Sequence, residues 1–499
     1  MKLKTIVIAT LLITNSALAE NMQVRGSNEP ALSGRSYEPA KNIDMSLPEL
    51  GDVSQTVLSP LDELHIGEQI MRDVSTSDEV VQDIEIIDYL NNLGNRLVSA
   101  SSDKQQKFNF FVVQDNSINA FAMPGGVIGV HTGLILATNS ESELASVLGH
   151  EIGHVTQHHM ARMLASQKYD TFKSIAGIAL ALLVARANPD LASGALTTAS
   201  AVGVQNQLDY TRDHEREADR VGLQILDNAG FDVRAMPTFF TTLQRGTRFA
   251  EGSAPSFLRT HPLTSERIAD VSNRVSQMSY RQVPDSVEFQ YIRAKLIANN
   301  GSADTNIEVF AQNIREHRYM NEAAEHYGLA VAYLRKNSLL QAEKEVAWLK
   351  KCAPQHAMIE NLSARVQVAR NNPQQAAKQY ATALKLYPDN RALIYGYADH
   401  FLAIKQADNA IKLIKEKQGL YPNDAQFYDV LAKAYTMQNK VLLSYQAQGE
   451  AYFRKYDLAR AIEQMELAVK ANDGDFYQTS IVEARLKELR RMMGDAKKS

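Results

Sequence analysis

Apolar residues recur at intervals of three and four along most of the chain beyond residue 60, and this spacing predicts a mainly helical protein. Two helices are expected within residues 61–98. Short apolar runs at 108–113 and 127–131 predict two β-strands, joined by a turn-rich connection over residues 119–126. The expected fold class is therefore α+β, mainly α, with a small sheet.

The second half of the chain repeats with a period of 34 residues. The repeated positions are Pro354, Pro388 and Pro422, and Ala342, Ala376 and Ala410. This period is typical of tetratricopeptide (TPR) repeats, in which small residues let two helices pack closely and a proline marks the turn into the next pair. We expect four repeats that stack into an α-solenoid. Whether a further pair of helices caps them is left open. The alternative is a non-repetitive helical bundle. It is disfavoured because the prolines and the alanines both repeat at the same interval.

The N-terminus has a different pattern. Lys2 and Lys4 precede a short apolar run that ends in Ala17-Leu18-Ala19, which predicts a secretory signal peptide cut after Ala19 and hence a periplasmic protein. The next residue is Glu20 rather than cysteine, which disfavours a lipid anchor. Residues 20–48 have no periodicity and are expected to form an extended lead-in.

Two apolar stretches, at 172–185 and 192–204, are each shorter than the roughly 20 residues that a membrane-spanning helix needs. They predict a buried or cleft-covering helical pair. Peripheral contact with a membrane, or contact with a client protein, is the alternative.

Composition narrows the function classes. The formal net charge is −4, which gives no electrostatic basis for nucleic-acid binding. Cys352 is the single cysteine, so no intrachain disulfide can form, and its place at a predicted helix end makes it a poor candidate nucleophile.

The strongest chemical signal is His150-Glu151-Ile152-Gly153-His154, an HExxH motif within a helical pattern that begins near Asn139 or Ser140. Two histidines four residues apart share one face of a helix, so both imidazoles can bind one metal ion. The glutamate between them is placed to take a proton from a water at that metal. The alternative is a solvated helix face that carries two histidines by chance.

A catalytic zinc needs a third protein ligand, and a second helical pattern offers one. Glu215 and Asp219 are four residues apart on one face, so Glu215 could bind the metal and Asp219 could accept a hydrogen bond from a ligating imidazole. The alternative is a helix start that is rich in acids for electrostatic reasons.

The strand at 126–131 comes shortly before this metal helix. We expect it to form the edge of the substrate cleft, where an extended peptide can add as a further strand. The expected substrate-binding residues are Gly126, Val127, Ile128, Gly129 and Val130. A plain core strand is the alternative.

These motifs, together with the turn at 119–126, His261-Pro262, Arg267-Ile268 and the repeats, resemble the M48 metallopeptidase family, and within it the periplasmic, TPR-containing type that enhances β-barrel assembly. The resemblance covers nearly all of the chain after the signal peptide. It implies a zincin-like metallopeptidase domain that holds one Zn²⁺ through His150, His154 and Glu215. It also implies that Glu151 is the general base and Asp219 a supporting catalytic carboxylate.

The resemblance further implies a periplasmic endopeptidase and chaperone-like factor in outer-membrane protein assembly and quality control, latent until activated. The partners would be unfolded or misassembled outer-membrane proteins, including the lipopolysaccharide-export barrel, and the barrel-assembly machinery, contacted through the TPR domain. The single cysteine departs from the family, so a disulfide in relatives has no counterpart. The expected domains are a signal peptide at 1–19, a lead-in at 20–48, a metallopeptidase domain at 49–285 and a TPR domain at 286–499.

His261 lies on a turn before a proline and has three interpretations. It could occupy the open position of the zinc as a fourth ligand and keep the enzyme latent, as the family suggests. It could instead stabilise the negatively charged oxygen (oxyanion) of the tetrahedral intermediate. It could also have no role beyond packing. Arg267 is expected to be a structural ion-pair partner, and His158, His159 and His214 are expected at the surface or behind the metal ligands.

Two rival functions remain at this point. One is a TPR scaffold or chaperone for outer-membrane β-barrel assembly with a largely silent zinc site. The other is a zinc hydrolase that acts on bonds other than the peptide bond, which the expected edge strand disfavours.

Overall fold

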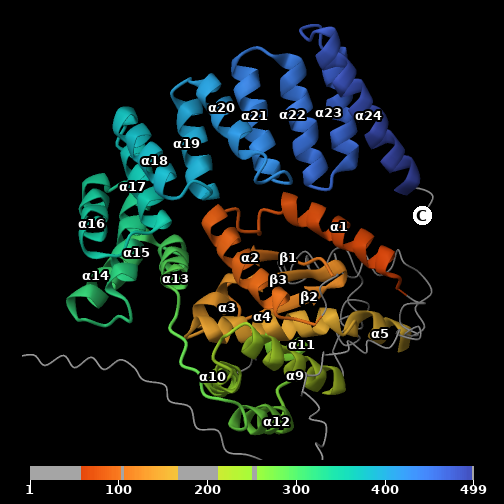
Figure 1. The fold of residues 1–499 in the computed structure, drawn as a ribbon. Helices are drawn as coiled ribbons and strands as arrows, with labels where there is room; N and C mark the ends of the chain where they lie inside the picture. The colour runs from red at the N-terminus through yellow and green to blue at the C-terminus, as the bar shows by residue number, and fades with distance from the viewer. Residues whose placement is uncertain (1–57, 103–105, 167–211, 250–255, 497–499) are drawn as a thin grey trace, which may run out of the picture. The chain divides into compact units, whose positions relative to one another are not determined.

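The computed structural model describes residues 58–102, 106–166, 212–249 and 256–496 (Figure 1). The expected signal peptide at 1–19, the lead-in at 20–48 and the apolar helical pair within 172–204 lie outside these residues. Across the described ranges, no helix combines the length and the hydropathy needed to cross a bilayer.

The fold begins with two helices in the region where the sequence predicts them, α1 (Pro60–Thr76) and α2 (Ile84–Ser99). Ser59 caps α1 by accepting a hydrogen bond from the Asp62 backbone N–H, and the Asp62 side chain accepts one from Ser59 in return. Asp83 caps α2 in a similar way. The apolar residues along one face of α2 are buried against the sheet. The face that the sequence pattern marks as apolar is therefore the face that packs.

The sheet has three strands, one more than predicted. They are β1 (Asn109–Val113), β2 (Ala120–Met123) and β3 (Val127–His131). The strand order is β1-β3-β2, with β3 parallel to β1 and antiparallel to β2. The prediction of a turn over residues 119–126 was therefore wrong for 120–123, which form a short, fully buried strand.

This order corrects the expected substrate strand. Val127, Ile128, Gly129 and Val130 belong to β3, the central strand, whose main-chain groups already pair with a neighbour on each side. Gly126 lies before the strand, in the short 3₁₀ turn η2 (Pro124–Gly126). A substrate cannot pair with a strand that already has a neighbouring strand on each side. In the order β1-β3-β2, β2 is a strand at the edge of the sheet.

The central helix of the N-terminal part is α4 (Glu141–Thr156), which Ser140 caps. Its residues from 141 to 154 are all buried, which is typical of a helix surrounded by other elements. The remaining helices around it are α3 (Thr132–Ala137), α5 (His159–Ser166), α9 (Arg212–Asn228), α10 (Ala235–Phe249), α11 (Ser256–Thr260) and α12 (Ser265–Ser276).

Small residues set the distance between α4 and α9. A Cβ atom on Gly222 of α9 would lie 2.8 Å from the backbone N of His150 and 2.9 Å from the carbonyl C of Gly149. A Cβ atom on Gly153 of α4 would lie 3.0 Å from the carbonyl O of Ala218. The two backbones therefore touch, and this close approach brings side chains of α9 next to those of α4.

Gly222→Ala is expected to separate α4 from α9 and destabilise the protein by about 1–3 kcal/mol, the usual cost of inserting a methyl group into a packed core. The free energy of unfolding of the metal-free protein and its affinity for Zn²⁺ measure the effect. Gly494→Ala is the matched control, since a Cβ atom at this helical glycine meets nothing within 4 Å. Unchanged stability and zinc affinity in Gly222→Ala would show that α4 and α9 do not need a glycine here.

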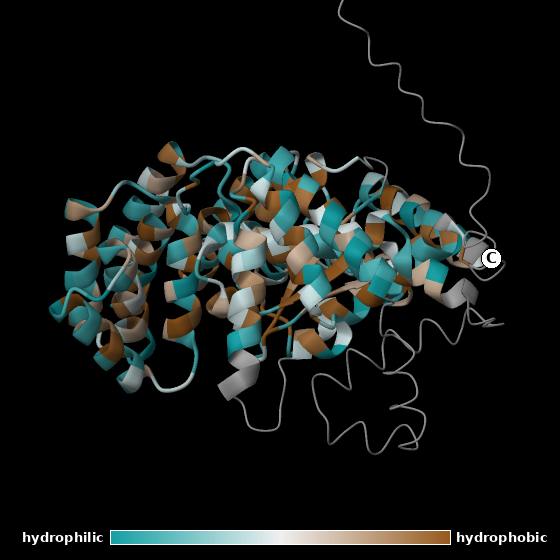
Figure 2. Cartoon of the chain, turned by 90° about the horizontal axis from the view of Figure 1, so that it is seen from below, coloured by the Kyte–Doolittle hydropathy of each residue, from teal (hydrophilic) through white to brown (hydrophobic). Residues whose placement is uncertain are grey.

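From Val287 onward the described chain is a series of helical hairpins. The helices are α13 (Val287–Asn299), α14 (Ala303–Arg315), α15 (Glu322–Arg335), α16 (Leu339–Cys352), α17 (Ala357–Ala369), α18 (Pro373–Leu386), α19 (Arg391–Ala403), α20 (Ala407–Lys417), α21 (Ala425–Met437), α22 (Val441–Arg454), α23 (Leu458–Lys470) and α24 (Phe476–Ala496). Hydrophobic and hydrophilic residues both occur along these helices, as expected of amphipathic helices that pack on one side (Figure 2).

Four of these hairpins share one turn geometry. The residues between their helices, Asn337, Asn371, Lys405 and Asn439, are 34 positions apart and all have a positive φ, between 56° and 62°. The hairpins from α15 to α22 therefore form four regular repeats, flanked by the pairs α13/α14 and α23/α24. This agrees with the period read from the prolines and alanines.

Candidate metal centre

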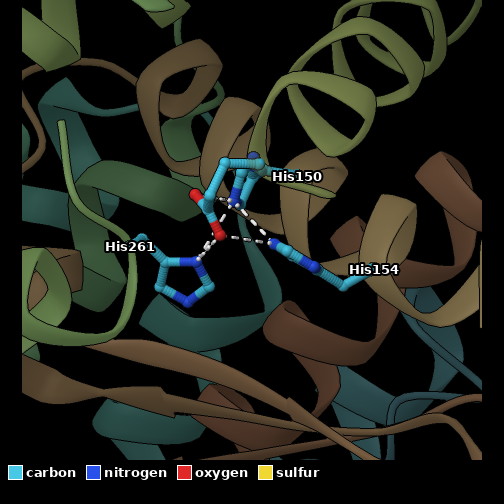
Figure 3. Close-up of side chains that lie close together, drawn as sticks. His150, His154 and His261 are labelled. Atoms are coloured by element: carbon cyan, nitrogen blue, oxygen red, sulfur yellow. Dashed lines mark hydrogen bonds and ion pairs between the residues drawn. The ribbon is translucent and has the colours of Figure 1, made fainter. Parts of the chain in front are cut away.

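Four buried side chains meet where α4, α9 and the turn after α11 come together. They are His150, His154, Glu215 and His261, and one ligand atom from each lies within 4.8 Å of all the others. In Figure 3, dashed lines join the three labelled histidines to the carboxylate of a fourth side chain. The structure thus brings together the two histidines of the HExxH motif, the acid expected as the third ligand and the histidine of uncertain role.

The distances in this cluster fit a metal ion. His150 Nε2 lies 3.0 Å from His154 Nε2 and 3.5 Å from Glu215 Oε2, and His154 Nε2 lies 3.3 Å from Glu215 Oε1. Ligands about 2.0–2.1 Å from a tetrahedral zinc are separated by roughly 3.3 Å, so the three side chains are spaced as zinc ligands would be. Imidazole nitrogen and carboxylate oxygen are also the donor types of catalytic zinc sites.

Asp219 lies behind His150. Its Oδ1 is 3.0 Å from His150 Nδ1, on the side of the ring that faces away from the cluster. A carboxylate at this position fixes the tautomer and the orientation of an imidazole whose other nitrogen faces a metal. The contact fits the supporting place expected for Asp219.

Arg267 of α12 has a larger part than the sequence indicated. Its Nε and Nη2 donate to the two oxygens of Asp219 at 2.7 and 2.8 Å, and its Nη1 lies 2.6 Å from Glu215 Oε2. The side chain is only 3% exposed. Arg267 is an ion-pair partner, as expected, but of two acids from another helix. Sequence spacing could not reveal this, because 48 residues separate Arg267 from Asp219.

The charged groups in the cluster change the pKa values of one another. Burial disfavours an imidazolium, but hydrogen bonds to Asp219 and Glu215 outweigh it and raise the pKa of His150 to about 10. Burial would raise the pKa of both acids. The charge of His261 and hydrogen bonds from the histidines nevertheless lower the pKa of Glu215, and hydrogen bonds from Arg267 and His150 lower that of Asp219. Both carboxylates are therefore ionised at neutral pH, which suits a dication.

Glu151 is fully buried, and neither of its carboxylate oxygens has a hydrogen-bond partner among the described residues. An ionisable group that lies close to it is His261, whose Nε2 is 3.5 Å from Glu151 Oε1. A buried carboxylate without a hydrogen bond is costly, so its presence in a native site calls for an explanation. A water at the metal would be such a partner.

His261 contacts the ligand cluster directly. Its Nδ1 lies 2.9 Å from Glu215 Oε1 and 3.4 Å from His150 Nε2, and its ring stacks on Phe257 with centroids 4.7 Å apart. The side chain is 1% exposed. The position of His261 is thus compatible with that of a fourth ligand, and pure packing would not require its nitrogen to face these groups.

The three histidines expected at the surface or behind the ligands, His158, His159 and His214, lie outside the cluster of four. His159 is fully buried, with Nδ1 2.9 Å from His154 Nδ1, and the ring of His214 stacks on it with centroids 4.5 Å apart. His158 is partly exposed, 3.8 Å from Glu63. Of the two positions expected for His159, the structure therefore shows the one behind a candidate ligand and not the one at the surface.

Two known protein families match parts of this chain. The sequence profile of peptidase family M48 matches residues 88–275, and a tetratricopeptide repeat profile matches residues 361–435. The beta-barrel assembly-enhancing protease of Escherichia coli (strain K12) is 31% identical over 453 residues, which cover 90% of this chain and 92% of the relative. A Vibrio cholerae serotype O1 protein with the same functional name is 33% identical over 426 residues, 85% of this chain and 88% of its own length.

A further relative matches about half of this chain. The mitochondrial metalloendopeptidase OMA1 of Arabidopsis thaliana is 30% identical over 244 residues, which cover 48% of this chain and 43% of the relative. These matches confirm the family, the mainly helical fold with TPR repeats and the metal-dependent peptidase class that the motifs predict. The chain belongs to peptidase family M48 and is a metalloprotease with a tetratricopeptide repeat domain.

Proposed function

We propose that this protein is a zinc-dependent endopeptidase of the periplasm that acts in outer-membrane protein assembly and quality control. The observation that carries the proposal is the buried cluster of His150, His154 and Glu215 beside Glu151, whose carboxylate accepts no hydrogen bond from the described residues. The cellular role is taken from the relatives named as beta-barrel assembly-enhancing proteases. Unfolded or misassembled outer-membrane proteins are the proposed substrates. The barrel-assembly machinery is the proposed partner of the repeats.

His150, His154 and Glu215 would hold the zinc ion. When bound, zinc supplies a lowered pKa for the attacking water and polarises the scissile carbonyl. Glu151 accepts the proton of the water on a carboxylate oxygen and then delivers it to the leaving amine. Asp219, itself held by Arg267, keeps the His150 ring oriented while the proton moves. Burial of all these groups limits access of bulk water, which strengthens each electrostatic interaction.

We infer that the substrate binds as an extended strand along β2. This strand packs against α4 and is at the edge of the sheet. Its four residues are buried in the described structure, so the main chain of a substrate would pair beside it only after the groups that cover β2 have moved aside. Pairing of this kind recognises backbone and is tolerant of side chains, which suits a protease for unfolded proteins.

His261 is proposed to keep the enzyme latent by occupying the position that the catalytic water or the substrate carbonyl needs. Its Nδ1 lies within 3.4 Å of both His150 Nε2 and Glu215 Oε1. A third imidazole would complete a four-coordinate structural-type zinc site, which leaves no position open for catalysis. Activation would then require displacement of the turn that carries His261.

His261→Ala is expected to increase cleavage of an unfolded outer-membrane protein by 10-fold or more, with the zinc content unchanged. Initial rates of substrate cleavage and metal analysis measure the two quantities. The double variant His261→Ala/Glu151→Gln is the control and should be inactive. A loss of activity in His261→Ala with zinc retained would contradict latency and favour stabilisation of the oxyanion instead.

The proposed function is tested by metal analysis combined with an assay for cleavage of an unfolded outer-membrane protein. We expect one zinc per chain, cleavage in its presence, and loss of cleavage after treatment with a chelator. A purified protein that binds no zinc, or that cleaves equally well without it, would overturn the proposed function.

A scaffold role is the second candidate, because His261 lies where it would close the metal site and because the repeats make up a large part of the chain. The two functions are separated by complementation of a deletion strain under envelope stress. Full complementation by Glu151→Gln favours the scaffold, whereas failure of this variant favours proteolysis.

A further inference from the structure

We propose that His159 is a positioning residue for His154, and that it acts through a hydrogen-bonded chain that continues to Glu217 and Arg162. The inference rests on the proposed function, in which His154 Nε2 binds zinc. It adds a residue outside the HExxH motif to the groups on which metal binding depends.

A break in the helix places His159 beneath His154. Helix α4 ends at Thr156, and His158 adopts a left-handed backbone conformation with a φ of 49° before α5 begins at His159. In an unbroken helix, residues five apart do not share a face. The turn instead folds the buried His159 ring back, so that its Nδ1 lies 2.9 Å from His154 Nδ1.

Zinc binding determines which nitrogen carries each proton. His154 Nε2 must offer its lone pair to the metal, so Nδ1 carries the hydrogen and donates it. His159 Nδ1 then accepts, and the hydrogen of this second ring is on Nε2. That nitrogen lies 3.0 Å from Glu217 Oε2 and can donate to it. Arg162 Nη1 donates to the same oxygen at 2.9 Å. Only one tautomer of each ring is compatible with the whole chain of contacts.

Behind each histidine of the motif, a carboxylate is thus followed by a guanidinium group. Behind His150 come the carboxylate of Asp219 and the guanidinium of Arg267. Behind His154 come the carboxylate of Glu217 and the guanidinium of Arg162, with the His159 ring inserted between ligand and carboxylate. Groups that orient a ligating histidine typically change metal affinity 10- to 100-fold when they are removed.

The test compares His159→Leu with His159→Gln in the full chain. Affinity for Zn²⁺ is measured by competition with a chelator, and ligand geometry by the visible absorption spectrum of the Co²⁺-substituted protein. Leucine cannot accept the hydrogen from His154, so we expect zinc affinity to fall 10- to 100-fold and the Co²⁺ spectrum to change. Glutamine offers an amide oxygen to His154 and an amide N–H to Glu217, so it should restore most of the affinity. His158→Asn, which keeps a residue that tolerates the left-handed turn, is the control and should bind zinc like the wild type.

Glu217→Ala provides a second variant in case His159→Leu does not fold, since the Glu217 side chain is 38% exposed. Its zinc affinity should fall several-fold. Wild-type affinity and an unchanged Co²⁺ spectrum in His159→Leu would overturn the proposal, as would a glutamine variant that is folded but binds as weakly as the leucine variant. A wild-type protein that binds no zinc would overturn the proposed metal centre itself, and this result is visible before any variant is compared.

Discussion

Replacement of Glu151 by glutamine is expected to abolish peptide-bond hydrolysis and leave the metal in place. Glutamine has nearly the same shape as glutamate but cannot take a proton from water, and a positioned general base contributes roughly 10²–10⁴-fold to the rate. Glu151 is not among the side chains that would bind the ion, so zinc content should stay at the wild-type value. Cleavage of an unfolded substrate by an otherwise active background, such as His261→Ala, and metal analysis measure the two effects.

The stability of this variant provides a second readout. The Glu151 carboxylate is buried without a hydrogen-bond partner in the described part of the chain, so its removal should relieve a desolvation cost. We expect the metal-free Glu151→Gln protein to be more stable by about 1 kcal/mol, a gain of the kind seen when a functional group is removed. Glu143→Gln is the matched control, since Glu143 is a buried acid of the same helix that accepts a hydrogen bond from the backbone N–H of Asn139. Retained hydrolysis in Glu151→Gln would refute its role as base.

Replacement of Arg267 by methionine is expected to destabilise the metal-free protein by about 3–5 kcal/mol, the cost of removing one partner from a buried ion pair. Without the guanidinium, the carboxylates of Asp219 and Glu215 remain buried with much less compensation. His150 would also lose the group that fixes its supporting acid, so zinc affinity should decrease as well. Chemical denaturation of the metal-free protein and zinc competition measure these two quantities.

Arg274→Met is the matched control on the same helix. Arg274 is exposed and pairs with Asp270 at 3.1 Å, four residues away, so its loss should change stability by no more than about 0.5 kcal/mol. Arg267→Lys should lie between wild type and methionine, because a lysine keeps the charge but cannot make the paired hydrogen bonds to Asp219. Equal stability of the Arg267 and Arg274 variants would contradict a structural role for Arg267 in the metal centre.

The local parts of the site were accessible from the sequence. The spacing of His150 and His154 implied one helix face, and Ser140 is one of the two caps expected for that helix. Glu215 could be proposed as a ligand from its own motif and from the family resemblance, but only the packing of α9 on α4 through Gly222 brings it within 3.5 Å of His150. A glycine inside a helix does not by itself reveal which backbone it lets approach.

The sequence alone determined the helical class, the 34-residue repeat and the metal motif. Each of these depends on interactions between residues close together along the chain, and such interactions leave a regular spacing. The tertiary structure decided the order of the strands, which makes β3 central and β2 the edge, and it decided that Arg267 and His159 support the ligands. These results depend on which distant segments pack together. Packing of that kind follows from the shape and burial of the whole core, and no spacing within one segment records it.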